Sequence, residues 1–184
     1  MGNLELEWRN IKLIHYSKDF FDFIYDCYQD YNSIYLFCNQ LEIKSKNEFW
    51  VNFTNKMDKT YNEYMIIISK ENNNPIGFIY SYNYNTINQT IYTAIYVIEK
   101  YRKGIIGATA GMIFYNYLFK MKPIRKIYCT VYEYNKDSLN LLKTAGFKEE
   151  GILKKHRFFN GDYYNMHIMA LKREELYKIL GRAT

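Results

Sequence analysis

The spacing of apolar residues predicts several helices. Apolar side chains recur every three or four positions over residues 18–30, 45–57, 107–121 and 137–144, which is the period of an amphipathic helix. Ser17 stands directly before the first of these segments, where its hydroxyl can cap the helix. The segment 107–121 has the strongest helical pattern, so we expect one of its faces to pack into the core.

Runs of β-branched and aromatic residues predict strands around these helices. The predicted strands cover residues 11–14, 64–68, 76–83, 90–98, 125–132, 152–159 and 163–171. Asn160 and Gly161 separate the last two runs, which predicts a tight hairpin turn. Residues 31–45 show no clear pattern. Strands separated by helices over a chain of 184 residues predict a single α/β domain spanning residues 1–184.

Composition and charge narrow the classes of protein that fit the chain. The net charge of +6 favours anionic partners in general, but the basic residues form no long block, so we expect no nucleic-acid partner. The 3 cysteines lack the spacing of a zinc site or a disulfide framework. No signal peptide pattern and no apolar run of roughly 18 residues is visible. We therefore expect a cytoplasmic protein without a membrane partner.

A basic turn that contains glycine joins the strand ending near Ile98 to the helix over 107–121. The turn reads Arg102-Lys-Gly-Ile-Ile-Gly-Ala108. The first N–H groups of a helix are unpaired and lie at the positive end of its dipole, so they bind phosphate groups. The spacing fits neither GxxxxGK[ST] nor GxGxxG. The turn is thus a candidate pyrophosphate site, with an ordinary strand-to-helix turn as the alternative.

Two further motifs follow this turn in the chain. Asn135-Lys-Asp-Ser138 opens the helix over 137–144, and Gly146-Phe147 ends it. Together with the turn, they make the sequence similar to the GNAT superfamily of N-acetyltransferases, most closely to the ribosomal-protein and amino-sugar (RimJ/RimL-like) subgroup. The resemblance implies a GNAT-like α/β (α+β) fold with a central mixed, mostly antiparallel sheet, flanked by helices and opened by a splayed, V-shaped cleft.

The resemblance also implies acetyl-CoA as the co-substrate and no metal ion. In the family, the strand before the turn pairs with the pantetheine arm, the turn holds the pyrophosphate, and the Asn and Ser of N-x-x-S often contact the pantetheine or the thiol end. The residues at these positions are Tyr96, Val97 and Ile98 for the arm, Arg102, Lys103, Gly104, Ile105, Gly107 and Ala108 for the pyrophosphate, and Asn135 and Ser138 for the thiol end.

The chain departs from the family pattern at three positions. Ile105 stands at the middle glycine of the turn motif. Leu142 stands where many members carry a tyrosine that protonates the leaving thiolate. Arg157 stands where the subgroup carries a glutamate proposed as base. In that subgroup the serine of N-x-x-S is the proposed acid, which here is Ser138.

The expected chemistry is direct attack of an amine on the thioester within a ternary complex. Amines are mostly protonated at pH 7, so a general base is needed. Glu133 is the first candidate, and an exposed carboxylate without a catalytic role is the alternative. Tyr134 is a lesser candidate, as are Tyr132 and His156.

The acceptor is left open by the sequence. A small-molecule amine is favoured, namely an amino sugar, a polyamine or an amino acid, and selection is expected in residues 31–57 and 152–165. The alternatives are a protein N-terminus or lysine as acceptor, and a degenerate member that binds CoA without turnover. A homodimer is compatible with the sequence.

Overall fold

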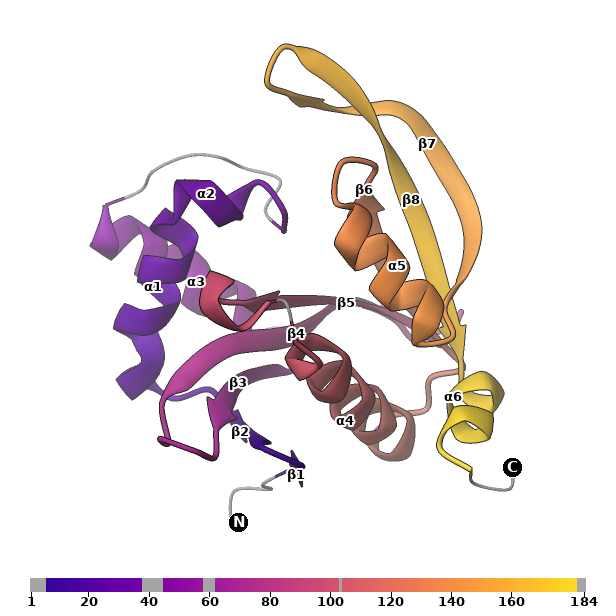
Figure 1. Ribbon diagram of the computed structural model, residues 1–184, viewed down its shortest axis with the longest axis horizontal. Helices are drawn as coiled ribbons and strands as arrows, with labels where there is room; N and C mark the ends of the chain where they lie inside the picture. Colours follow the sequence, from indigo (N-terminus) through magenta and orange to yellow (C-terminus); the bar gives the residue numbers. More distant parts are fainter. Residues whose placement is uncertain (1–5, 38–44, 58–61, 103, 182–184) are drawn as a thin grey trace. The chain divides into compact units, whose positions relative to one another are not determined.

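The computed structural model describes residues 6–37, 45–57, 62–102 and 104–181 (Figure 1). The strands are β1 (Leu6–Trp8), β2 (Ile11–His15), β3 (Tyr64–Ser69), β4 (Pro75–Asn85), β5 (Thr90–Val97), β6 (Lys126–Tyr132), β7 (Lys148–Phe159) and β8 (Asp162–Lys172). The helices are α1 (Phe21–Gln29), α2 (Tyr31–Ile34), α3 (Lys46–Met57), α4 (Ile106–Met121), α5 (Lys136–Thr144) and α6 (Arg173–Ile179), with 3-10 helices at Lys18–Phe20 and Glu99–Tyr101. Every predicted strand and helix is confirmed, while β1, α2 and α6 were not predicted.

The helix ends show where the sequence prediction needs correction. The hydroxyl of Ser17 donates to the carboxylate of Asp19 at 3.1 Å and makes no cap bond, so the predicted cap is wrong. A side-chain cap is present at α3, where Ser45 and Glu48 bond to each other. The Ser45 hydroxyl accepts from the Glu48 N–H at 3.3 Å, and the Glu48 carboxylate accepts from the Ser45 N–H at 3.1 Å. This reciprocal pair is a capping box. Asp30 caps α2 by accepting from the Asn32 N–H at 3.1 Å.

The strands form a mixed sheet in the order β1-β2-β3-β4-β5-β6-β8-β7. Strands β5 and β6 pair in parallel, while β1 with β2, β2 with β3, β3 with β4, β6 with β8 and β7 with β8 pair antiparallel. The chain divides into two compact units, unit 1 (Met1–Tyr82 and Ile95–Phe114) and unit 2 (Asn83–Ala94 and Tyr115–Thr184). Strands β4 and β5 and helix α4 pass through both. The predicted mixed, mostly antiparallel sheet is confirmed, and a single domain over residues 1–184 stays a prediction.

Unit 1 is built around β3, which is buried along its whole length. Its Tyr64, Ile66 and Ile68 pack with Ile24 and Phe53, which come from α1 and α3. The burial of these apolar side chains is the main source of stability for such a layer. Phe78 of β4 and Tyr96 of β5 belong to the same cluster. The end of β5 is therefore fixed by the unit 1 core.

Unit 2 contains α5 and the long arm formed by β7 and β8, drawn in orange and yellow in Figure 1. The arm turns at Asn160 and Gly161, whose φ angles of 50° and 88° fit the predicted hairpin turn. Gly146 has a φ of 88°, and a Cβ there would overlap the Ile179 side chain of α6. The glycine of the Gly146-Phe147 pair is thus required by its backbone conformation, whereas the overlapped atom is the end of the exposed Ile179 side chain, which can move aside.

Strand β5 pairs with β6 over a short stretch only. The parallel register joins Thr90–Tyr92 to residues 126–128, although β5 continues to Val97 and β6 to Tyr132. The hydrogen-bonded pairing of β5 with β6 therefore ends before either strand does, as it must where two strands splay apart.

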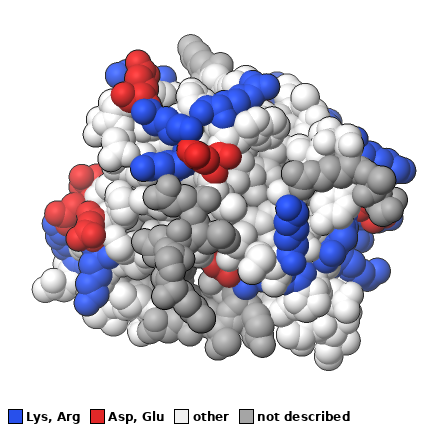
Figure 2. All heavy atoms as spheres, turned by 90° about the horizontal axis from the view of Figure 1, so that it is seen from below, with Lys and Arg blue, Asp and Glu red and all other residues white. Residues whose placement is uncertain are grey.

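The surface carries charges of both signs. On the face drawn in Figure 2, Lys and Arg side chains are spread widely, and acidic side chains stand beside several of them. Among the described residues, no helix is both long and apolar enough to cross a membrane. In the same residues, no three His, Cys, Asp or Glu side chains gather in a way that could hold a metal ion.

Candidate active site

The end of β5 is held closely against β4 in unit 1. The Ile98 N–H donates to the Ile76 carbonyl at 3.0 Å, and the Tyr101 N–H donates to the Ile98 carbonyl at 2.9 Å. A Cβ on Gly77 would overlap the Tyr96 carbonyl oxygen and lie 3.1 Å from the Val97 Cα. Both main-chain groups of Ile98 are therefore engaged within the protein. Since neighbouring strand residues direct these groups to opposite edges, those of Val97 face away from β4.

The start of α4 lacks a capping side chain suited to its role. The Thr109 N–H donates to the Ile105 carbonyl at 2.8 Å, so Ile105 occupies the cap position. Isoleucine is among the poorest capping residues because it offers no acceptor, and this side chain is 51% exposed. The N–H groups of Ile106, Gly107 and Ala108 belong to the first turn, where no carbonyl of the helix can reach them. An anion would satisfy them.

The turn before α4 leaves room at its glycine. Among the described residues, a Cβ on Gly104 would find only the Tyr101 carbonyl oxygen nearby, at 3.9 Å. The predicted phosphate-binding residues Gly104, Ile105, Gly107 and Ala108 thus share one short stretch of unit 1. The predicted role of Lys103 lies outside the described residues.

Arg102 is oriented differently from the rest of the turn. Its Nε donates to the Val97 carbonyl at 2.7 Å, and its guanidinium lies over the Tyr96 ring at 5.2 Å. Its main-chain N–H donates to the Glu99 carbonyl at 3.1 Å. The sequence could not show this orientation, because a basic residue beside a glycine turn fits a phosphate ligand equally well.

The Asn and Ser of N-x-x-S open α5 in unit 2. The Asn135 Oδ1 accepts from the Ser138 N–H at 3.2 Å, and the Asn135 carbonyl accepts from the Leu139 N–H at 3.2 Å. Asn135 is therefore the N-cap of α5, a role that its residue type favours. Ser138 is partly exposed in the first turn of this helix.

Glu133, the first candidate for the base, is tied to β8. Its Oε2 accepts from the Asn165 N–H at 3.1 Å, and its own N–H donates to the Asn165 carbonyl at 2.9 Å. The carboxylate is exposed and bonded to main chain, which gives it a structural role beside the predicted one. Tyr134 lies among aromatic rings, with centroids 5.0 Å from Phe159 and 5.1 Å from Tyr164.

These local arrangements can be compared with known proteins. A family model described as "Acetyltransferase (GNAT) domain" matches residues 21–168. The chain belongs to the GNAT acetyltransferase family. The predicted family is confirmed, and membership agrees with the predictions of N-acetyltransferase activity and of acetyl-CoA as co-substrate.

Similar proteins extend the comparison. An SPbeta prophage-derived uncharacterized N-acetyltransferase, YokL of Bacillus subtilis (strain 168), is 32% identical over 114 residues. This match covers 61% of the present chain and spans only 64% of the length of the relative.

Two solved structures share the GNAT fold with the chain. Spermidine N-acetyltransferase from Vibrio cholerae, in complex with CoA and spermine, superposes with a TM-score of 0.84 at 20% identity, over 91% of this chain and 98% of that one. RimL, a ribosomal L7/L12 alpha-N-protein acetyltransferase in complex with coenzyme A, gives a TM-score of 0.81 at 14% identity, over 92% and 98%. Both likenesses confirm the predicted fold class.

The motifs do not show the surroundings of two side chains in this GNAT chain, Leu142 and His167. Leu142, at the position where many members carry a tyrosine that acts as the general acid, is buried in α5. The His167 Nδ1 lies 2.6 Å from the Glu149 Oε2. The two residues are far apart in the chain, and only the pairing of β7 with β8 brings them together. Gly77 was detectable, since a glycine within a strand often marks a close backbone approach.

Proposed function

We propose that the chain transfers an acetyl group from acetyl-CoA to a primary amine, by direct attack within a ternary complex. The observation that carries the proposal is the start of α4, which follows the end of β5: the Ile105 carbonyl accepts from the Thr109 N–H, which makes Ile105 the cap residue, and its side chain offers no acceptor to the first N–H groups of the helix. In a chain of the GNAT family, this is the arrangement that a pyrophosphate group would complete.

The cofactor would bind along the end of β5 and the turn. The N–H groups from Gly104 to Ala108 would hold the pyrophosphate. The Val97 carbonyl, which can accept a second hydrogen bond beside the one from Arg102, would pair with the pantetheine arm. The Val97 N–H would donate to the oxyanion that forms when the amine attacks the thioester. A fixed main-chain donor suits this task because it needs no reorganisation as charge develops.

The proton transfers are assigned to unit 2. Ser138 is proposed to protonate the leaving thiolate, since Leu142 has no ionisable group and is buried. Glu133 is proposed as the base that deprotonates the amine, directly or through water. Tyr134 is the second candidate, held in place by its aromatic neighbours.

A small-molecule amine is the proposed acceptor, and the charges of the two units bear on its class. Unit 1 exposes two acidic side chains along α1, Asp22, which pairs with Lys46 at 2.7 Å, and Asp26. The Asp26 carboxylate favours a cationic amine such as a polyamine. In unit 2, the β7 segment Lys154–His156 is exposed and basic. That segment favours an acceptor with acidic groups, including a protein N-terminus, which is the alternative. A binder of CoA without turnover is the other alternative, supported by the replacements at Ile105 and Leu142.

The acceptor is tested by release of free thiol from acetyl-CoA. The protein is mixed with acetyl-CoA and one amine at a time: spermidine, an amino sugar, free lysine, or a peptide with an acidic N-terminal sequence. Saturable release with one of the first three supports a small-molecule acceptor, and release with the peptide alone supports the alternative. No release with any of them, despite tight binding of acetyl-CoA, contradicts the proposal of an amine acetyltransferase.

Variants of Asn135 and Ser138 distinguish a structural role in α5 from a role in proton transfer. Ser138→Ala should lower kcat by about tenfold or more, since general acids contribute factors of this size, and should leave unfolding unchanged. Asn135→Ala should instead cost about 1 kcal/mol of the free energy of unfolding, because it removes the N-cap of α5. Turnover and urea unfolding measure the two effects. Full activity in Ser138→Ala would show that another group, or water, protonates the thiolate.

A further inference from the structure

The Arg102 side chain forms part of a polar network inside unit 1. Its Nε donates to the Val97 carbonyl at 2.7 Å, and its guanidinium lies 5.2 Å above the Tyr96 ring. The Nη2 atom is buried and has no partner among the described residues. The guanidinium is therefore directed toward β5, because its Nε donates to the main-chain carbonyl of Val97.

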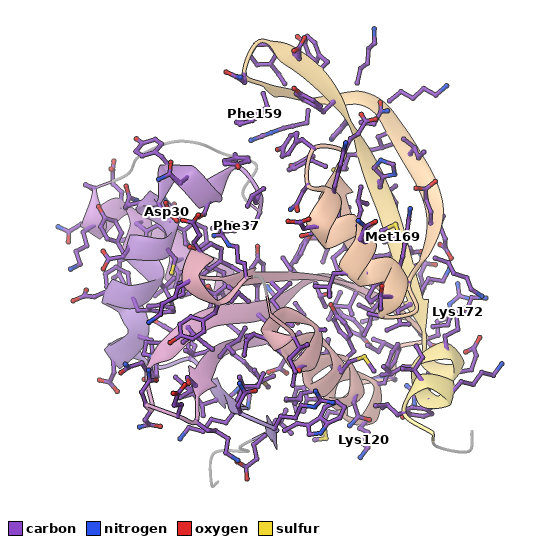
Figure 3. The ribbon with its side chains drawn as sticks, viewed as in Figure 1. Asp30, Phe37, Lys120, Phe159, Met169 and Lys172 are labelled. Carbon is purple, nitrogen blue, oxygen red and sulfur yellow. The ribbon has the colours of Figure 1, made fainter. Side chains whose placement is uncertain are left out.

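The network continues from Tyr96 to the start of α2. The Tyr96 hydroxyl donates to the Asp30 Oδ2 at 3.3 Å, while the Asp30 Oδ1 accepts from the Asn32 N–H at 3.1 Å. Tyr96 is only 5% exposed, and burial raises its pKa to about 12, so the hydroxyl stays protonated and can donate. Phe37 packs on Tyr96 with ring centroids 4.7 Å apart. Figure 3 labels Asp30 and Phe37, which lie close together in unit 1.

The charge of Arg102 is also compensated from within the protein. A guanidinium over an aromatic face is attracted by the ring, more strongly when both are shielded from water. The planar guanidinium can donate to a carbonyl and stack on a ring at the same time, which a lysine ammonium cannot do. Swinging the side chain out to a phosphate group would give up both contacts and uncover the Val97 carbonyl.

We propose that Arg102 is a positioning residue for the pantetheine arm of the cofactor, held in place by Tyr96 and Asp30, and is not a ligand of the phosphates. It fixes the main chain of Val97, the residue that the proposed function pairs with that arm, and the inference rests on that proposed function. The link through Asp30 ties the start of α2 to the same strand. Acceptor selection is expected in residues 31–57, and this segment begins directly after Asp30, which is bonded to Tyr96 of β5.

The test compares two ligands by calorimetric titration. One is CoA, and the other is adenosine 3′-phosphate 5′-diphosphate, which keeps the phosphates of CoA but lacks pantetheine. Arg102→Met should weaken CoA binding by about tenfold, or 1.4 kcal/mol, and change nucleotide binding less than about twofold. Arg102→Lys should behave like Arg102→Met, because a lysine keeps the charge but loses the stacked, planar donor. Tyr96→Phe should weaken CoA binding by about threefold, as expected for one lost hydrogen bond.

Lys100→Met is the matched control, because it removes a positive charge from the same exposed turn and should leave both affinities nearly unchanged. An equal loss for both ligands in Arg102→Met, with rescue by Arg102→Lys, would identify a phosphate ligand and overturn the proposal. Wild-type affinities in Tyr96→Phe would overturn it as well. Urea unfolding of each variant shows that it is folded, and Tyr96→Phe removes only one oxygen atom. A wild-type chain that binds neither ligand would instead overturn the proposed function, which distinguishes the two failures.

Discussion

Gly107→Glu is expected to abolish binding of acetyl-CoA, with a rise in Kd of roughly 100-fold or more. Gly107 lies in the first turn of α4, among the N–H groups that are proposed to hold the pyrophosphate. A glutamate there would place a negative charge and extra bulk against two phosphates. The fold should persist, because an acidic side chain near a helix N-terminus interacts favourably with the helix dipole. Titration with acetyl-CoA measures the loss, and urea unfolding measures stability.

Met121→Glu is the matched control for this variant. It introduces the same side chain at the other end of α4, where Met121 is 62% exposed. The change in net charge is therefore identical, while the distance from the proposed phosphate site is the length of the helix. Its affinity for acetyl-CoA should stay close to that of the wild type. Near-normal binding in Gly107→Glu would contradict the placement of the pyrophosphate.

Gly77→Ala is expected to lower the free energy of unfolding by about 1 to 3 kcal/mol, the range found for overpacked cores. The added Cβ would overlap the Tyr96 carbonyl oxygen and lie 3.2 Å from the Ile67 side chain. The overlapped atom belongs to the main chain, so relief requires β4 and the end of β5 to move apart. Because Val97 follows directly, binding of acetyl-CoA should also weaken. Urea unfolding gives the first effect and titration the second.

Gly104→Ala provides the comparison in the same unit. Within the part of the chain that the structure describes, its Cβ would approach only the Tyr101 carbonyl oxygen, at 3.9 Å. The free energy of unfolding should therefore change by less than about 0.5 kcal/mol, as for most surface substitutions. Equal losses in the two glycine variants would mean that the close approach at Gly77 does not hold the end of β5.

Most elements of the fold could be predicted because their signals are local. The long apolar face of α4, the Asn160-Gly161 turn and the N-x-x-S cap of α5 each depend on a few neighbouring residues. The helix α2 could not be predicted in the same way. It is only four residues long, and its cap, Asp30, also binds Tyr96, which lies 66 positions away in the chain.

The candidate site shows the same division. The uncapped start of α4 follows from sequence order, since Ile105 stands where a capping residue is needed. The orientation of Arg102 does not, because the choice between a phosphate and the Val97 carbonyl depends on what packs beside it. Likewise, Glu133 reads as a free carboxylate until the pairing of β6 with β8 brings the Asn165 N–H to it.

Calorimetric titration of the wild-type chain with acetyl-CoA tests the central claim most directly. The claim is that the end of β5 and the start of α4 bind this cofactor despite Ile105 at the middle glycine of the turn. Saturable binding with a stoichiometry of about one per chain, lost in Gly107→Glu and kept in Met121→Glu, is the predicted result. Absence of binding by the folded wild-type protein would contradict the account, because no other part of the proposed chemistry can proceed without the cofactor.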